Sequence, residues 1–457
     1  MLSRLKPIVV TSTPQALVTL RSFSSPSLVA RAKAAKPPAR KQAHKGAGFK
    51  VKKEEYVGSR KTTAVSKPSV LPASQLAEHH LLQSSPQDLG LPEPTPSVFT
   101  TRATGSAIAL PSKAGSIIGT YGLPLSTENE FSLLSRPTTV IRDATLSLVD
   151  VLDKGLKDGT SSKDTRVVLT GNSGAGKSHL LLQAVSYAAA SRWIVLYIPR
   201  AINWVDSTTP YAYDARTRTF QQPELALQTL GQFVEANSGI LRDPSTQIMV
   251  DIQNERLGSF PKGTPLSKLL DVGLKDQSLA TEVLEITLKL LGEQSKYPIL
   301  IAVDDFQALF CMSKYRDPQY ELIFSHHFTL ARIVLEYASG KRILTKGAII
   351  GAISSTNPRF LEPLPLKEAL NVTPTRTVSP YERRNKDIVA YASGLKGLPI
   401  PSKMRVGEAA CMFDIWAQNN ALHTRPSDSL FLSKYVEASG NPRDMVKSGL
   451  LATLGTS

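Results

Sequence analysis

The chain has 457 residues, which is enough to bury a substantial core and to form two or three structural units. No apolar run approaches the length of a membrane-spanning helix, and Cys311 and Cys411 have no metal-ligand spacing, so we expect a soluble protein without a zinc site or a disulfide framework. The net charge of +16 is uneven: residues 1–53 contain twelve Lys or Arg and no acid, whereas the other 42 Lys and Arg are nearly balanced by 38 Asp and Glu.

Residues 1–23 have the composition of a mitochondrial transit peptide. The segment is rich in Arg, Ser and Leu, contains no acid, and lacks the longer apolar centre of a secretory signal. Arg21 and Phe23 resemble a matrix-protease site, which predicts cleavage after Phe23 and a location in the mitochondrial matrix. The alternative is a disordered tail on a cytosolic protein.

Residues 24–130 are predicted to form an extended arm with two compositions. Nine Lys or Arg lie between Arg31 and Lys53 among Ala, Gly and Pro, and such a run cannot bury enough apolar surface to fold alone. RNA is the best candidate for a polyanionic partner of this run, and a solvated tail is the alternative. From about 54 to 130 the chain is rich in Ser, Thr and Pro without sustained periodicity, so we expect it to become ordered by lying on another surface.

Residues 131–365 are predicted to form a nucleotide-binding α/β domain. A helix is expected over 138–157, and the buried strand 167–170 is followed by the spacing Gly171-x-x-x-x-Gly176-Lys177-Ser178 and then by an apolar helix. This pattern fits a phosphate-binding loop, in which backbone N–H groups and the helix N-terminus favour anions. The lysine would bring a positive charge to the outer phosphates and the serine a hydroxyl to Mg²⁺. A glycine-rich turn is the alternative.

The segments after this loop predict a parallel sheet. Residues 193–198 read as a second strand, and a helix with Pro223 in its first turn follows. Strands that alternate with helices indicate a parallel α/β sheet. Lys177 and Asp304 are 127 positions apart, so an insertion that is largely helical over 265–293 must separate the second strand from the acidic one.

Two acids follow the apolar strand 299–303. A phosphate loop requires a metal partner, usually a carboxylate at the end of another buried strand, so Asp304 is the predicted Mg²⁺ ligand. Asp305 stands where many P-loop ATPases carry a water-activating Glu and is the candidate catalytic base, although its side chain is one methylene shorter. A helix N-cap or a solvated acid is the alternative for Asp305.

Polar residues at two later positions are further candidates. The strand 347–353 ends in a polar segment from which Asn357 or Ser355 could contact the outer phosphate or a water, unless the segment is only a polar turn. Residues 366–457 are predicted to form a helical C-terminal domain that ends in a helix over 442–454. Arg443, on the first turn of that helix, could swing onto a phosphate, and the alternative is an arginine that faces solvent or RNA.

Several stretches together resemble the death-associated protein 3 family, the GTP-binding protein of the mitochondrial small ribosomal subunit. They are GNSGAGKSHLL, WIVLYIPRA, QQPELALQTL, ILIAVDDFQALF, GAIIGAISSTNP and SGNPRD, and the resemblance covers about 135–457. The resemblance implies a P-loop NTPase with an AAA-like parallel sheet and Mg²⁺ held by Ser178 and Asp304. It also implies contacts with ribosomal RNA, neighbouring mitoribosomal proteins and the large subunit through an intersubunit bridge. The residues implied for the nucleotide phosphates are Gly171, Asn172, Ser173, Gly174, Ala175, Gly176, Lys177, Ser178 and His179.

The sequence lacks one motif that is expected of a GTP-binding protein. No [NT]-K-x-D motif for reading guanine is present, because Asn385-Lys386-Asp387 lacks the spacer. Base choice must therefore rest on other contacts, with GTP or GDP favoured and ATP as the alternative. We favour a structural small-subunit protein with at most slow hydrolysis over an AAA-type matrix ATPase acting on nucleic acid or protein, because only Asp305 and no arginine finger can be identified.

Overall fold

The computed structural model describes residues 89–112, 115–157, 160–243, 246–374, 377–379, 381–422 and 424–451. The predicted transit peptide, 1–23, and the basic run, 31–53, lie outside these residues, as does the rest of the predicted arm up to residue 88.

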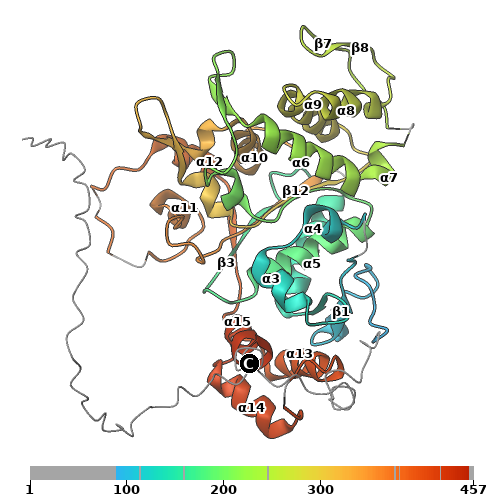
Figure 1. The fold of residues 1–457 in the computed structure, drawn as a ribbon, viewed down its shortest axis with the longest axis vertical. Coiled ribbons are helices and arrows are strands. Elements are labelled where there is room, and N and C mark those ends of the chain that lie inside the picture. The colour runs from blue at the N-terminus through green and yellow to red at the C-terminus, as the bar shows by residue number, and fades with distance from the viewer. Residues whose placement is uncertain are drawn as a thin grey trace, which may run out of the picture. The chain divides into compact units, whose positions relative to one another are not determined.

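The molecule is built around one parallel β-sheet. Five strands are hydrogen-bonded in the order β13-β3-β12-β9-β4, and each neighbouring pair is parallel. The sheet and the helices around it are drawn in Figure 1. The strands are β3 (Arg166–Thr170), β4 (Ile194–Ile198), β9 (Ile299–Val303), β12 (Gly347–Ala352) and β13 (Lys396–Pro399). The predicted α/β class with a parallel sheet is therefore confirmed.

Each face of the sheet carries its own hydrophobic core. Side chains alternate along a strand, so Ile299 and Ile301 of β9 pack into one core while Leu300 packs into the other. All residues of β3, β4, β9 and β12 are buried, as expected for strands covered on both faces. The first core is covered by α6 (Pro223–Ala236), α8 (Leu266–Lys275), α9 (Ala280–Glu293), α10 (Thr329–Ser339), α11 (Leu364–Ala369) and α12 (Lys386–Ala392). The second is covered by α4 (Asp143–Leu156), α5 (Lys177–Ala190) and α13 (Val406–Gln418).

The insertion between β4 and β9 is helical over α8 and α9, as predicted, but it also contains two hairpins. The first hairpin pairs β5 (Ala212–Asp214) with β6 (Thr219–Gln221), and the second pairs β7 (Ile252–Asn254) with β8 (Gly258–Phe260). In Figure 1 the β7–β8 hairpin extends beyond α8 and α9. A third hairpin, β10 (Met312–Arg316) with β11 (Leu322–Phe324), follows β9. Shorter elements here are η2 (Ala201–Trp204), α7 (Ser238–Leu241), η3 (Phe306–Phe310) and η4 (Ser325–His327).

The described end of the predicted arm packs against the second core. After η1 (Thr101–Ala103), the strand β1 (Ala107–Ala109) pairs antiparallel with β2 (Thr138–Val140), and the helices α2 (Ile117–Tyr121) and α3 (Leu125–Phe131) lie between them in the chain. Ile108, Leu110 and Tyr121 are buried. The expected helix over 138–157 therefore begins only at Asp143, because its first residues pair as β2.

Residues 366–457 are mainly helical but also contribute β13 to the sheet, which the prediction of a helical domain missed. The strand is short and carries Gly397 and Pro399, so it lacks the apolar run that marks the other strands. Beyond it lie α13, α14 (Asp428–Glu437), α15 (Pro442–Met445) and a π-helical turn, η5 (Val446–Leu451). In Figure 1, α13, α14 and α15 gather at one end of the drawn molecule.

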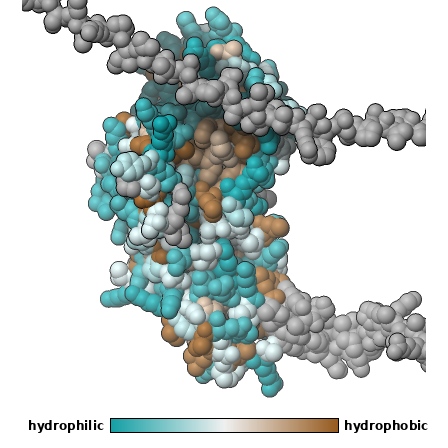
Figure 2. All heavy atoms as spheres, turned by 90° about the vertical axis from the view of Figure 1, so that its left-hand side faces the viewer, coloured by the Kyte–Doolittle hydropathy of each residue, from teal (hydrophilic) through white to brown (hydrophobic). Residues whose placement is uncertain are grey.

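The face drawn in Figure 2 carries mostly hydrophilic residues, interrupted by apolar patches. Among the residues with described structure, no helix is both long enough and apolar enough to cross a membrane.

Candidate functional site

The predicted phosphate loop connects β3 to α5 and has a backbone that requires glycine. Gly171 has φ 132° and Gly174 has φ 80°, in the region that side chains disfavour. A Cβ on Gly174 would lie 2.4 Å from Oδ1 of Asn441, and one on Gly171 would lie 2.7 Å from the carbonyl oxygen of Ile400. The loop is therefore closely packed against two segments of the C-terminal region.

Lys177 begins α5 and turns its ammonium group back onto the loop. Its Nζ donates to the carbonyl oxygens of Gly171 and Asn172, both at 2.8 Å, and the residue is 7% exposed. Burial, and after it the positive charge of Arg443, lower the pKa of Lys177 to about 8. An anion bound at this helix N-terminus would therefore be favoured, because it would offset a cation that burial has deprived of water.

Asp304 follows β9 and meets the loop residue Ser178. The carboxylate is 3% exposed and accepts a hydrogen bond from the N–H of Asp305 at 2.9 Å. Burial, and then the charge of Asp305, raise the pKa of Asp304 to about 7, whereas the nearby hydroxyl of Ser178 favours the charged form and so lowers that pKa. The structure thus brings together the two residues assigned to Mg²⁺.

Ser178 and Asp304 fit a Mg²⁺ ion that would bind together with a nucleotide. No group of three or more His, Cys, Asp or Glu in the described part of the chain could hold a metal ion alone. Mg²⁺ commonly binds through one or two protein ligands together with phosphate oxygens and water. A serine hydroxyl and a buried carboxylate beside the predicted phosphate loop form such a partial ligand set.

Asp305 is held by other side chains. It has φ 55°, and its Oδ2 lies 3.7 Å from Nε of Arg200. Burial raises the pKa of Asp305, although Ser354 and Arg200 oppose that shift. The carboxylate of Asp305 is therefore in contact with the guanidinium of Arg200.

Arg443 and Asn357, the other two residues predicted to bind nucleotide, differ in whether they reach the loop. Arg443 reaches the loop: its Nη1 donates to Oγ of Ser173 at 2.7 Å and its Nη2 to Oγ1 of Thr356 at 3.4 Å. The side chain of Asn357 instead accepts from the N–H of Arg359 at 3.0 Å. Of the residues after β12, Ser354, Ser355 and Thr356 line the cavity described next, and Asn357 does not.

A cavity of about 320 Å³ opens beside the loop. Its lining joins four parts of the chain: the loop with the start of α5, the segment from α3 to β2, the end of β12, and the C-terminal helices. The larger apolar side chains in the lining are Leu134, Val140, Leu180, Ile353, Met404, Met412, Ile415, Trp416, Val446 and Leu451. Ligand pockets commonly combine an apolar lining with a few polar groups, and this one adds a loop suited to phosphate.

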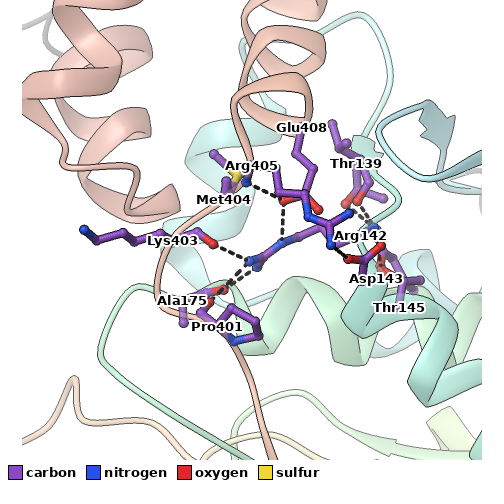
Figure 3. A network of polar contacts seen from close by, with 12 residues as sticks. Thr139, Arg142, Asp143, Thr145, Ala175, Pro401, Lys403, Met404, Arg405 and Glu408 are labelled. Atoms are coloured by element: carbon purple, nitrogen blue, oxygen red, sulfur yellow. Dashed lines mark hydrogen bonds and ion pairs between the residues drawn. The ribbon is translucent and has the colours of Figure 1, made fainter.

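Arg142, which the sequence analysis did not identify, ties the loop to the C-terminal region (Figure 3). Its Nη1 donates to the carbonyl oxygen of Ala175 at 2.7 Å, and its Nε lies 3.3 Å from Oε2 of Glu408 on α13. Its Nη2 donates to the carbonyl oxygens of Pro401 at 3.3 Å and Lys403 at 3.4 Å. No motif marks Arg142, because its partners come from segments remote in sequence.

Comparisons with known proteins cover most of the chain. The family model described as mitochondrial ribosomal death-associated protein 3 matches residues 139–448. The small ribosomal subunit protein mS29 of Schizosaccharomyces pombe is 27% identical over 392 residues, which is 84% of this chain and 79% of that protein. The mS29 of Neurospora crassa is 28% identical over 335 residues, 70% of this chain and 69% of that protein. The matched region includes the sheet, the loop and the helices α5 and α13 beside the cavity, but not α3, and the chain belongs to the mitochondrial ribosomal death-associated protein 3 family.

Proposed function

We propose that the chain is a structural component of the mitochondrial small ribosomal subunit in the matrix and holds a guanine nucleotide with Mg²⁺ as a built-in ligand. Membership of the family, together with relatives named as small ribosomal subunit proteins, supports the ribosomal part. The observation that carries the nucleotide part is the glycine loop with its buried Lys177, which borders a cavity of about 320 Å³.

In this proposal the sheet is that of a P-loop NTPase, and the loop binds phosphates. The N–H groups from Gly171 to His179 and the ammonium of Lys177 would contact phosphate oxygens, because both lie at the positive end of α5. Mg²⁺ would be held by Ser178 and Asp304 and would neutralise phosphate charge. Arg443, already hydrogen-bonded to the loop through Ser173, would add a second cation.

The C-terminal region supports a ligand that is retained rather than turned over. Nδ2 of Asn441 donates to the carbonyl oxygen of Ser173 at 3.0 Å, and the N–H of Arg443 donates to that of Gly174 at 3.2 Å. These contacts hold one side of the loop against the C-terminal region, so the loop would keep its shape around a bound nucleotide. A component of this kind would hold nucleotide through many rounds of translation with at most slow hydrolysis.

The proposed partners are those of a subunit embedded in a ribosome. Ribosomal RNA would be contacted by the basic run 31–53, because Lys and Arg gain affinity for phosphate by releasing counterions. Neighbouring mitoribosomal proteins and an intersubunit bridge to the large subunit complete the set.

The direct test is to identify what the purified small subunit carries. Nucleotide extracted from the subunit should be guanine nucleotide, close to one molecule per copy of this chain beyond the amount that other subunit proteins contribute. Cells with Lys177→Ala should yield subunits that lack that molecule. Wild-type subunits that lack this nucleotide, or Lys177→Ala subunits that contain as much of it as wild type, would overturn the proposed nucleotide binding. Neither result would contradict the proposed ribosomal role.

A further inference from the structure

We propose that Glu130, oriented by His179, reads the guanine base through its N1–H and N2 amino group and so replaces the missing [NT]-K-x-D motif. This inference rests on the proposed nucleotide site and assigns its base specificity. Glu130 lies near the end of α3, outside both the phosphate loop and the sheet.

Glu130 is placed where a base could meet it. It lines the cavity, and among the described residues that do so it is the only one with a carboxylate. Its side chain is 12% exposed, and its Oε2 lies 3.4 Å from Nε2 of His179. A carboxylate that is nearly removed from water and faces a cavity is a costly arrangement unless hydrogen-bond donors compensate for the lost water.

The start of α5 connects the phosphate end of the site to Glu130. Lys177 and Ser178 open the helix at the loop, and His179 and Gln183 also line the cavity, within the first two turns. The ring of Phe131 packs edge-on against the ring of His179, with centroids 5.7 Å apart. A nucleotide with its phosphates on the loop could therefore place its base along this part of α5, beside Glu130.

Gln183, the amide side chain beside this part of the cavity, is already hydrogen-bonded. The amide nitrogen of Gln183 donates to Oγ1 of Thr139 at 2.8 Å and to the carbonyl oxygen of Val140 at 2.9 Å. Its amide oxygen accepts from Thr145 at 2.7 Å. An ionised carboxylate offers about four acceptor positions, and the contact with Nε2 of His179, at 3.4 Å, occupies at most one of them. Glu130 therefore retains the capacity to accept two more hydrogen bonds.

Guanine suits this acceptor better than adenine does. The N1–H and N2 amino groups of guanine are adjacent donors and can bond to both oxygens of one carboxylate. Adenine offers one amino group at that edge, and its N1 lone pair would face the carboxylate. A site built to bond particular donors rejects a ligand that lacks them, because its buried acceptor is then left unpaired.

The test exchanges guanine for xanthine, in which a carbonyl oxygen replaces the N2 amino group. Binding of GDP, ADP and xanthosine diphosphate to the purified full-length chain is measured for wild type and Glu130→Gln. The carboxamide of the Glu130→Gln variant can accept from N1–H and donate to the carbonyl oxygen of xanthine. With guanine, its amino group would instead face the N2 amino group, and two donors cannot bond to each other. We expect the variant to lose GDP affinity by at least about tenfold and to gain affinity for xanthosine diphosphate.

Controls separate base reading from damage to the fold. Glu128→Gln, on the exposed side of the same helix, should leave all three affinities unchanged. Glu130→Asp keeps a carboxylate and should bind GDP more weakly while still preferring it to xanthosine diphosphate, which provides a test if Glu130→Gln does not fold. Guanine preference that survives in Glu130→Gln would overturn this inference alone. Wild type that prefers ADP would overturn this inference and the proposed guanine identity of the ligand, but not the nucleotide site. Wild type that binds none of the three would overturn the proposed nucleotide site as well.

Discussion

Arg142 and Glu408 form a buried ion pair, with Nε and Oε2 3.3 Å apart, between residues separated by 266 positions in the chain. Both side chains are under a tenth exposed, and the same guanidinium donates to the carbonyl oxygen of Ala175 in the predicted phosphate loop. The pair therefore couples the shape of the loop to the position of α13. Two further contacts reinforce this junction, because Arg405 pairs with Asp143 and its N–H donates to Glu408 (Figure 3).

Breaking this pair on one side should be costly. Arg142→Met leaves Glu408 buried without its cation, so we expect the free energy of unfolding to fall by about 3–5 kcal/mol. Replacing both residues, Arg142→Met with Glu408→Leu, should recover part of that loss, because no unpaired charge remains. Urea unfolding of the three proteins measures the difference. A single variant as stable as wild type would show that the pair contributes little.

Replacing Lys177, the cation of the loop, should have the same effects as destabilising the fold. A ligand that binds only the folded state, at a thousand times its dissociation constant, stabilises it by about 4 kcal/mol. Lys177→Ala should therefore reduce nucleotide retention, the abundance of the protein and small-subunit assembly together. The exposed Lys154, on α4, provides the control Lys154→Ala. Normal abundance of Lys177→Ala protein that carries no nucleotide would contradict a stabilising role.

The parts of the site that the sequence predicted are those carried by local patterns. The loop spacing located Lys177, and the apolar run before Asp304 located the acidic strand, because each pattern is contiguous. Glu130 and Arg142 were missed, since they lie on segments that meet the site only through the tertiary fold. The strand β13 was missed because Gly397 and Pro399 interrupt any strand-like pattern, and its place is fixed by pairing with β3.

The buried His326 predicts a dependence of stability on pH. Burial, and then the charge of His327, lower its pKa to about 4, and Arg332 and Lys341 act in the same direction, whereas Asp387 opposes them. The unfolded chain, with an ordinary pKa near 6.5, therefore binds a proton at a higher pH than the folded chain does. Stability should fall as the pH drops from about 6.5 toward 4, and this residue should account for about 2 kcal/mol between pH 7.5 and 5.

Thermal or urea unfolding across that pH range tests the assignment. His326→Gln should flatten the stability profile below pH 6.5, whereas His327→Gln, at a less buried position, should flatten it less. Parallel profiles for His326→Gln and wild type would show that other groups cause the acid sensitivity.

The basic run 31–53 should control binding of the assembled protein to RNA. Each Lys or Arg that contacts phosphate steepens the dependence of log affinity on log salt by roughly 0.7–0.9 units. Deleting the run should weaken association with the small subunit and flatten that slope in salt-titrated sedimentation. If affinity and slope both survive the deletion, the run is only solvated.

A substitution of Asp305 distinguishes a nucleotide that is held as a structural ligand from one that a motor ATPase hydrolyses. Asp305→Asn keeps the shape of the side chain while removing its capacity to act as a base toward an attacking water. If the site only holds nucleotide, the variant should assemble into small subunits and support translation almost as well as wild type. The measurement pairs multiple-turnover hydrolysis by the purified protein with mitochondrial translation in cells that carry the variant. Lys177→Ala serves as the comparison, because it should impair both binding and assembly. Fast hydrolysis by wild type that Asp305→Asn abolishes together with translation would favour the motor, since turnover would then be what translation requires.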